Sequence, residues 1–300
     1  MITRRDILRL AGTGIVASTL PGLTFARADT DARFVLVILR GAADGLAMAP
    51  PYGDGNYRSV RGELALPGPG EDGGVLKLDG LFGLHPSLPG VFEQYQRDQA
   101  IVVHAVASPY RERSHFDGQD VLENGASDVG LLRDGWLNRA LQTVNGVEAA
   151  AVGGALPLVL RGDAHAVSWA PSFLPEPDDD TLQRLMRMYE NDEGLHTALA
   201  DAESLDMAAG DIGGDARQVA RGRSYVPLML AGANRVASDA AGVVVLSLGG
   251  WDTHNNQGAQ SGVLAGRLRQ LDQGLAEVKK TLGPKWANTV VAVTTEFGRT

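Results

Sequence analysis

The fold is decided by residues 243–294, where two short apolar runs enclose one amphipathic segment. The runs are VVVLSL at 243–248 and TVVAVT at 289–294. Neither alternates regularly between polar and apolar side chains, so both are typical of strands buried on both faces of a parallel sheet. The segment between them repeats an apolar side chain every three or four residues, at Leu264, Leu268, Leu271, Leu275, Val278 and Leu282. This spacing predicts one apolar helical face, and the order strand, helix, strand predicts a βαβ unit.

Two further apolar runs extend the same pattern towards the N-terminus. They read FVLVIL at 34–39 and IVVHAV at 101–106. Four such runs predict an α/β fold with a mostly parallel sheet sandwiched by helices. We expect a single domain over residues 29–300, in which about 137–240 form an inserted or covering region with polar helices near 179–207.

The composition excludes several classes of function. The chain of 300 residues carries 27 Lys+Arg against 36 Asp+Glu, is 44% hydrophobic and contains no cysteine. A formal charge of −9 without a long basic run argues against nucleic acid as a partner. The absence of cysteine excludes thiol nucleophiles, disulfides and Cys-ligated metals.

Residues 1–28 have the features of an export signal. Arg4-Arg5 precedes an apolar stretch that is too short to span a bilayer, and Ala26-Arg27-Ala28 supplies a cleavage site. The paired arginines favour the twin-arginine signal, whose machinery would then be a partner, over an ordinary Sec signal with a basic start. We therefore expect a periplasmic or otherwise exported protein with no membrane span in its mature form. That form would carry 23 basic and 35 acidic residues.

Each predicted strand is followed by side chains that can carry chemistry. These are Asp44 after the first run, Ser114 after the second, Asp252 and His254 after the third, and Glu296 after the fourth. Each also has an ordinary structural explanation. Asp44 suits an Asp-Gly turn, and Ser114 with Asp117 resembles a helix capping box. Asp252 and His254 suit a turn, Glu296 suits a helix start, and His115 suits either a surface or a ligand histidine.

Their coincidence is more informative than any one of them. Carboxyl ends of parallel strands meet at one edge of a sheet, which is where α/β proteins bind ligands. Carboxylates gathered there would repel one another unless a cation neutralised them. The sequence therefore predicts a site for a divalent metal at this edge.

The set of motifs resembles the alkaline phosphatase/sulfatase superfamily, and more closely a family of twin-arginine-exported bacterial proteins of unknown function related to it. The resembling segments are the arginine signal and the stretches 39–46, 84–86, 113–117, 249–254 and 295–300. The resemblance implies that Asp44, Asp252, His254 and Glu296 bind metal and that Ser114 is the nucleophile that accepts phosphate or sulfate.

The chain departs from the superfamily pattern at three points. Phe297 stands where the pattern has a histidine, Asp252 and His254 are closer together than in the phosphatases, and the final Asp-His-Gly motif is missing. With more oxygen than nitrogen ligands, Mn²⁺, Mg²⁺ or Ca²⁺ suit the site as well as Zn²⁺. We expect a fold truncated at its C-terminus, with a natural chain longer by roughly one hundred residues.

Two functions from different classes follow. The first is an exported metal-dependent hydrolase of small phosphate or sulfate esters, in which Ser114 or a bound water attacks. The second is a non-catalytic exported protein that keeps the fold for binding or assembly, and the loss of histidine at position 297 motivates it.

Overall fold

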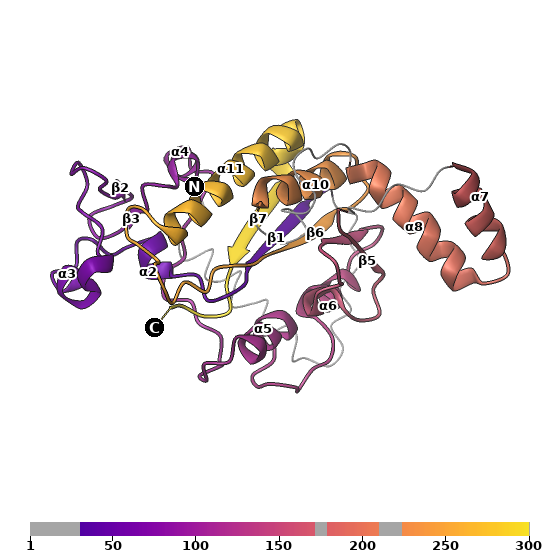
Figure 1. Cartoon of the computed structure of the whole chain (residues 1–300), viewed down its shortest axis with the longest axis horizontal. Coiled ribbons are helices and arrows are strands. Elements are labelled where there is room, and N and C mark those ends of the chain that lie inside the picture. Colours follow the sequence, from indigo (N-terminus) through magenta and orange to yellow (C-terminus); the bar gives the residue numbers. More distant parts are fainter. Residues whose placement is uncertain (1–30, 172–178, 210–223, 300) are drawn as a thin grey trace.

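The computed structural model describes residues 31–171, 179–209 and 224–299. The predicted export signal at 1–28 lies outside these residues. The described chain is an α/β fold built on a five-stranded parallel sheet with the strand order β5-β4-β6-β1-β7 (Figure 1). The strands are β1 (Arg33–Leu39), β4 (Ala149–Val152), β5 (Ala166–Trp169), β6 (Val243–Leu248) and β7 (Thr289–Thr294). The predicted fold class is therefore confirmed at the level of a helix-flanked parallel sheet.

The stretch 243–294 folds into a crossover unit that spans β1. The helix α11 (Val263–Leu282) connects β6 to β7, as its apolar spacing predicts. The two strands do not pair with each other, because β1 lies between them and pairs with both in parallel. The loops that follow β6, β1 and β7 are consequently neighbours at one edge of the sheet.

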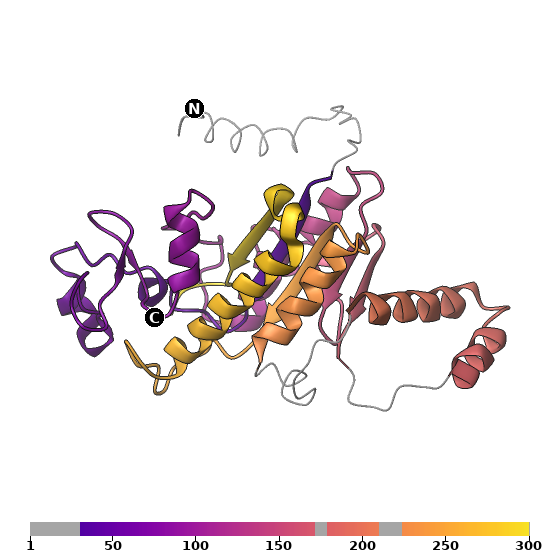
Figure 2. The same cartoon turned by 90° about the horizontal axis from the view of Figure 1, so that it is seen from above.

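Helices cover both faces of the sheet (Figures 1 and 2). Alternate side chains of β1, such as Val37, pack into a core with α4 (Pro89–Gln96), α10 (Tyr225–Ala237) and α11. The other alternate set, such as Ile38, packs with α6 (Trp136–Leu141), η2 (Leu158–Leu160) and the inner side of α5 (His115–Asn124). Burial on both faces explains why the strands read as continuous apolar runs.

The strand predicted at 101–106 is wrong. This segment forms no ladder, and Ile101, Val103 and Val106 are exposed. Only Val102 packs against the core, while the ring of His104 stacks on Phe82 with centroids 3.6 Å apart. An apolar run becomes a strand only where a partner supplies hydrogen bonds, and a short run does not reveal its partner.

The region 137–240, which was expected to be an insertion or a cover, is partly built into the central sheet. Its β4 and β5 belong to the central sheet, and β4 pairs with β6. The predicted helices near 179–207 are present as α7 (Asp179–Met188) and α8 (Glu193–Ala209), which extend away from the sheet (Figure 2).

The remaining elements are short, and most belong to the loop-rich segment after β1. These elements are α2 (Gly45–Met48), α3 (Tyr57–Arg61), η1 (Gly62–Leu64), β2 (Leu76–Lys77), β3 (Gly83–Leu84) and η3 (Gly283–Asn288). No helix in the described part of the chain is long and apolar enough to cross a membrane.

Candidate metal centre

Two histidines and one aspartate converge at the carboxyl edge of the sheet. His115 is the first residue of α5, while Asp252 and His254 lie in the loop after β6. One ligand atom of each residue lies within 4.8 Å of the others. Nε2 of His254 is 2.9 Å from Oδ1 of Asp252, and Nε2 of His115 is 3.7 Å from Oδ2. The carboxylate therefore sits between the two imidazoles.

Glu296, in the loop after β7, holds His115 from the opposite side of the ring. Its Oε1 lies 2.9 Å from Nδ1 of His115 and accepts from the backbone N–H of Gly41 at 2.9 Å. Burial raises the pKa of Glu296, but hydrogen bonds from His115, its own backbone, Gln119 and Gly41 outweigh burial, so the pKa lies below its usual value. The ionised carboxylate makes Nδ1 the donor. Nε2 of His115 is the ring nitrogen turned towards Asp252.

The backbone around β1 brings the other loops close. Gly41 has a φ of +117°, and a Cβ there would lie 2.4 Å from the backbone nitrogen of Asp252. Only glycine permits both this conformation and this approach. The hydroxyl of Thr295 donates to the carbonyl of Leu39 at 2.7 Å and accepts from the N–H of Ala43 at 3.0 Å. These contacts fix the loops after β6 and β7 against the end of β1.

Asp44, predicted as a metal ligand, is engaged elsewhere. It is buried and caps α2, and its Oδ2 accepts from Nη2 of Arg61 at 2.5 Å and from Nε2 of Gln257 at 2.7 Å. The convergent group contains His115 instead. Asp44 therefore has the structural role that its Asp-Gly sequence allowed. It caps a helix, and it also forms a buried ion pair with Arg61.

Ser114 is the N-cap of α5, and its Oγ accepts from the backbone N–H of Asp117 at 3.3 Å. It directly precedes His115, so it stands next to the convergent group in sequence. Phe297, which replaces the expected histidine, packs on the ring of His115 with centroids 5.0 Å apart. Its ring also stacks on Tyr110. An aromatic wall therefore closes this side of His115.

The structure brings together two of the four predicted metal ligands, Asp252 and His254. It places Glu296 behind His115 and separates Asp44 from the group. The sequence leaves His115 open between a surface and a ligand role, since a single histidine at a helix start is a weak signal. The sequence feature that points to it is its position beside Ser114, at the sheet edge where the other candidates were expected.

The donor set fits a divalent cation. Two imidazole nitrogens and one carboxylate are a set used by catalytic Zn²⁺ sites, which keep a further position open. They also suit other transition metals, whereas Mg²⁺ and Ca²⁺ prefer oxygen ligands. Because the structure adds a second imidazole, the balance shifts towards Zn²⁺ or another transition metal that imidazole binds, relative to the oxygen-rich set expected from the sequence.

Fold and site together define an α/β protein with a histidine- and carboxylate-rich edge. A family model described as "Protein of unknown function (DUF1501)" matches residues 76–300, and the chain belongs to this family. No curated protein and no solved structure matches the chain.

Proposed function

We propose that this protein is an exported metal-dependent hydrolase of phosphate or sulfate esters with an alkaline phosphatase-like core. The observation that carries the proposal is the convergence of His115, Asp252 and His254 at the carboxyl edge of the sheet. Two imidazoles turned towards one half-exposed carboxylate form a donor set that suits a bound divalent cation.

The residues of the site divide into three roles. His115, Asp252 and His254 bind the cation, while Glu296 orients His115 and keeps a proton on its Nδ1. When bound, a divalent cation supplies Lewis acidity towards a phosphoryl or sulfuryl oxygen and makes water a better nucleophile. Asp44 stabilises the fold beside the site rather than binding the metal.

Ser114 is the protein nucleophile that the site offers, and a water molecule is the alternative. Ser114 stands at the N-terminus of a ten-residue helix. The exposed N–H groups and dipole of this terminus favour an anionic ester. Attack on phosphorus or sulfur would form a new bond to oxygen as the bond to the alcohol breaks.

The metal is tested first, by elemental analysis of the purified mature protein. We expect wild type to retain Zn²⁺ or another transition metal, and Asp252→Asn and His115→Gln to lose it. His165→Gln is the matched control, because His165 also lies between two carboxylates, Glu148 and Asp201, but is not part of the group. A wild type that holds no cation, with stability unchanged by chelator, contradicts the metal site.

The hydrolase is tested with a panel of aryl phosphates and aryl sulfates. Ser114→Asp keeps a side chain that can cap α5 but removes the hydroxyl. If Ser114 is the nucleophile, both Ser114→Asp and Ser114→Ala abolish turnover while the protein stays folded. If water attacks, both variants retain activity. A metal-loaded wild type that is inert on the whole panel refutes the hydrolase.

A non-catalytic binding or assembly protein is the second candidate, and Phe297 favours it. An aromatic ring packs against His115 where a second metal pair would need a ligand. Asp44, the other residue expected to bind metal, is held by Arg61 and Gln257. A protein that binds metal but hydrolyses no ester supports this candidate.

Export through the twin-arginine pathway is proposed from the sequence of residues 1–28. Replacing Arg4 and Arg5 together by lysine should hold the precursor in the cytoplasm. Cell fractionation and immunoblotting measure where the variant accumulates. If the variant is still exported, this part of the proposal is contradicted.

A further inference from the structure

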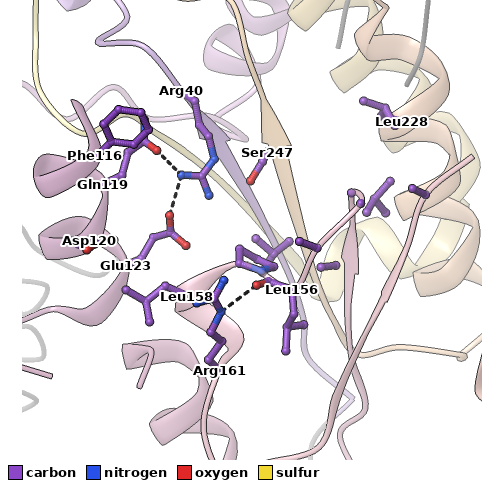
Figure 3. Close-up of a pocket in the computed structure, with 18 of the residues that line it drawn as sticks. Arg40, Phe116, Gln119, Asp120, Glu123, Leu156, Leu158, Arg161, Leu228 and Ser247 are labelled. Carbon is purple, nitrogen blue, oxygen red and sulfur yellow. Dashed lines mark hydrogen bonds and ion pairs between the residues drawn. The ribbon is translucent and has the colours of Figure 1, made fainter. Parts of the chain in front are cut away.

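A pocket with a volume of about 460 Å³ opens at the carboxyl edge of the sheet, where the loops of the candidate metal centre also lie. Figure 3 shows the side chains that line it. Its walls come from α5, from the end of β6 and from the loop after β4. This volume is within the range of pockets that hold small organic molecules. None of the roles assigned above to the metal centre uses this space.

A continuous chain of hydrogen bonds links the pocket to the metal centre. Gln119, which lines the pocket, donates from Nε2 to Oε1 of Glu296 at 3.1 Å and accepts on Oε1 from Nη1 of Arg40 at 2.6 Å. Nη1 of Arg40 also lies 2.7 Å from Oε1 of Glu123. Because Glu296 also holds Nδ1 of His115, this chain of hydrogen bonds reaches the metal centre from behind the His115 ring.

The pocket has two chemically distinct ends. Arg40, Gln119 and Glu123 gather on the side of α5, and Leu228 lies on the opposite side (Figure 3). Leu156, Leu158 and Val245 add further apolar surface. Because Glu123 neutralises Arg40, such a pocket suits a ligand with one hydrogen-bonding end and one apolar end.

Two side chains in the wall are unusual for their positions. Phe116 is 82% exposed, although it directly follows His115 and lines the pocket. An exposed aromatic ring there offers a stacking partner to another ring. Ser247 is the single polar residue in the buried strand β6, and it also lines the pocket. Its small side chain leaves room that a valine or leucine would fill.

We propose that this pocket receives the alcohol part of the ester and selects an aryl group. The inference rests on the proposed ester hydrolase. The phosphate or sulfate lies at the metal centre, the ester oxygen lies towards the end formed by Arg40 and Gln119, and the aromatic ring lies between Phe116 and the apolar wall. Compact aryl monoesters are therefore favoured over esters of small alcohols or of sugars, since the far end supplies mainly apolar contacts.

The test compares phenyl phosphate with methyl phosphate and phenyl sulfate with methyl sulfate. We expect the KM of wild type to be at least about tenfold lower for the phenyl esters, the size of effect that an apolar pocket gives. KM is the readout because phenol is a better leaving group than methanol, which raises kcat for phenyl esters with or without a pocket. Ser247→Leu, which fills the pocket, and Phe116→Ala, which removes the ring, should each erase that preference through KM. Ser59→Leu is the matched control, because Ser59 is exposed on α3 away from the pocket.

A second variant protects the test against misfolding of Ser247→Leu. A Cβ added to Gly154, which lines the pocket, meets no atom within 4 Å. Gly154→Val should therefore fold normally and lower the preference for phenyl esters in the same way. A phenyl preference that survives in all three pocket variants overturns the inference.

Binding without turnover separates this inference from the proposed function. Phenylphosphonate and methylphosphonate, which cannot be hydrolysed, are titrated into metal-loaded protein by calorimetry. If no ester is hydrolysed but phenylphosphonate binds, and Ser247→Leu abolishes that binding, then the hydrolase fails and the pocket stands. If esters are hydrolysed without discrimination, the pocket assignment fails and the hydrolase stands. Absence of both hydrolysis and phenylphosphonate binding overturns both.

Discussion

At the scale of single residues, the candidate site depends on what holds each carboxylate. Asp252 is half-exposed and lies between two imidazoles, so it is free to bind a cation. Asp44 is almost completely buried, and its oxygens accept from Arg61, Gln257 and the backbone of Ala47. Two aspartates that look alike at strand ends in the sequence thus have different surroundings, and only Asp252 belongs to the convergent group.

Replacing Asp44 by asparagine should destabilise the protein and spare the metal. Asp44→Asn leaves the nearly buried guanidinium of Arg61 without its counter-charge, which costs about 3 kcal/mol. Urea unfolding should show this loss, while elemental analysis should find the cation content of the folded protein unchanged. Glu112→Gln, at an exposed position, is the control for stability. A folded Asp44→Asn protein that has lost its metal would restore Asp44 as a ligand.

At the scale of elements, the contact between α10 and α11 supports the sheet face beneath them. Gly274 of α11 is buried against Met229 of α10, and a Cβ at position 274 would lie 2.2 Å from its Sδ. A second glycine of the same helix, Gly266, has only the tip of Arg269 within 4 Å, at 3.9 Å. Alanine at position 266 therefore tests helix propensity alone, whereas alanine at position 274 tests propensity together with packing against α10.

Alanine at these two positions should change stability in opposite directions. Gly266→Ala gains helix propensity without a clash and should stabilise the protein by about 1 kcal/mol. Gly274→Ala gains the same propensity but forces Met229 to move in a packed core, where overpacking costs about 1–3 kcal/mol. Denaturant unfolding of both variants checks this difference. Equal stabilisation would mean that α10 and α11 do not pack this closely.

At the scale of the whole molecule, His85 joins segments that are far apart in the chain. It is fully buried, with Nε2 2.8 Å from the carbonyl of Ala259 and Nδ1 accepting from the N–H of Ser87 at 3.0 Å. These partners fix the neutral form with the proton on Nε2. His85 thereby anchors the loop after β6, which also carries Gln257 and the metal-site residues.

The stability of the protein should fall in mildly acidic solution because of His85. Burial lowers the pKa of His85 below its ordinary value, an effect that Arg269 reinforces and the hydrogen bond to Ala259 opposes. The unfolded chain then binds the proton more readily than the folded chain. The contribution of neutral His85 to the free energy of unfolding is complete above a pH of about 6.5. It is lost as the pH falls towards the pKa of His85 in the folded protein, by at most about 1.4 kcal/mol per pH unit.

Urea unfolding between pH 7.5 and 5.5 checks this dependence. His85→Gln should be less stable than wild type at pH 7.5 but should lose less stability on acidification. His196→Gln is the control, since His196 is exposed and should follow wild type. If His85→Gln and wild type lose the same stability over this interval, the buried neutral histidine does not cause the loss.

The apolar runs of the sequence determined the parallel sheet and α11, because burial on both faces leaves a continuous apolar pattern. Strands at 34–39, 243–248 and 289–294 were predicted within one residue. The short strands β4 and β5 escaped detection, since segments of four residues carry little periodic signal and β4 is mostly alanine. The run at 101–106 failed as a strand because hydrophobicity alone supplies no ladder partner.

The sequence by itself also determined which chemistry was on offer at the sheet edge: carboxylate, imidazole and hydroxyl groups, with no thiol. Only the tertiary structure decided which of these side chains meet. It joined His115 to Asp252 and His254, set Glu296 behind His115, and gave Asp44 to Arg61 and Gln257. The physical reason is that residue type fixes what a side chain can bind, whereas its partners depend on loops packed across three adjacent strands and a helix start.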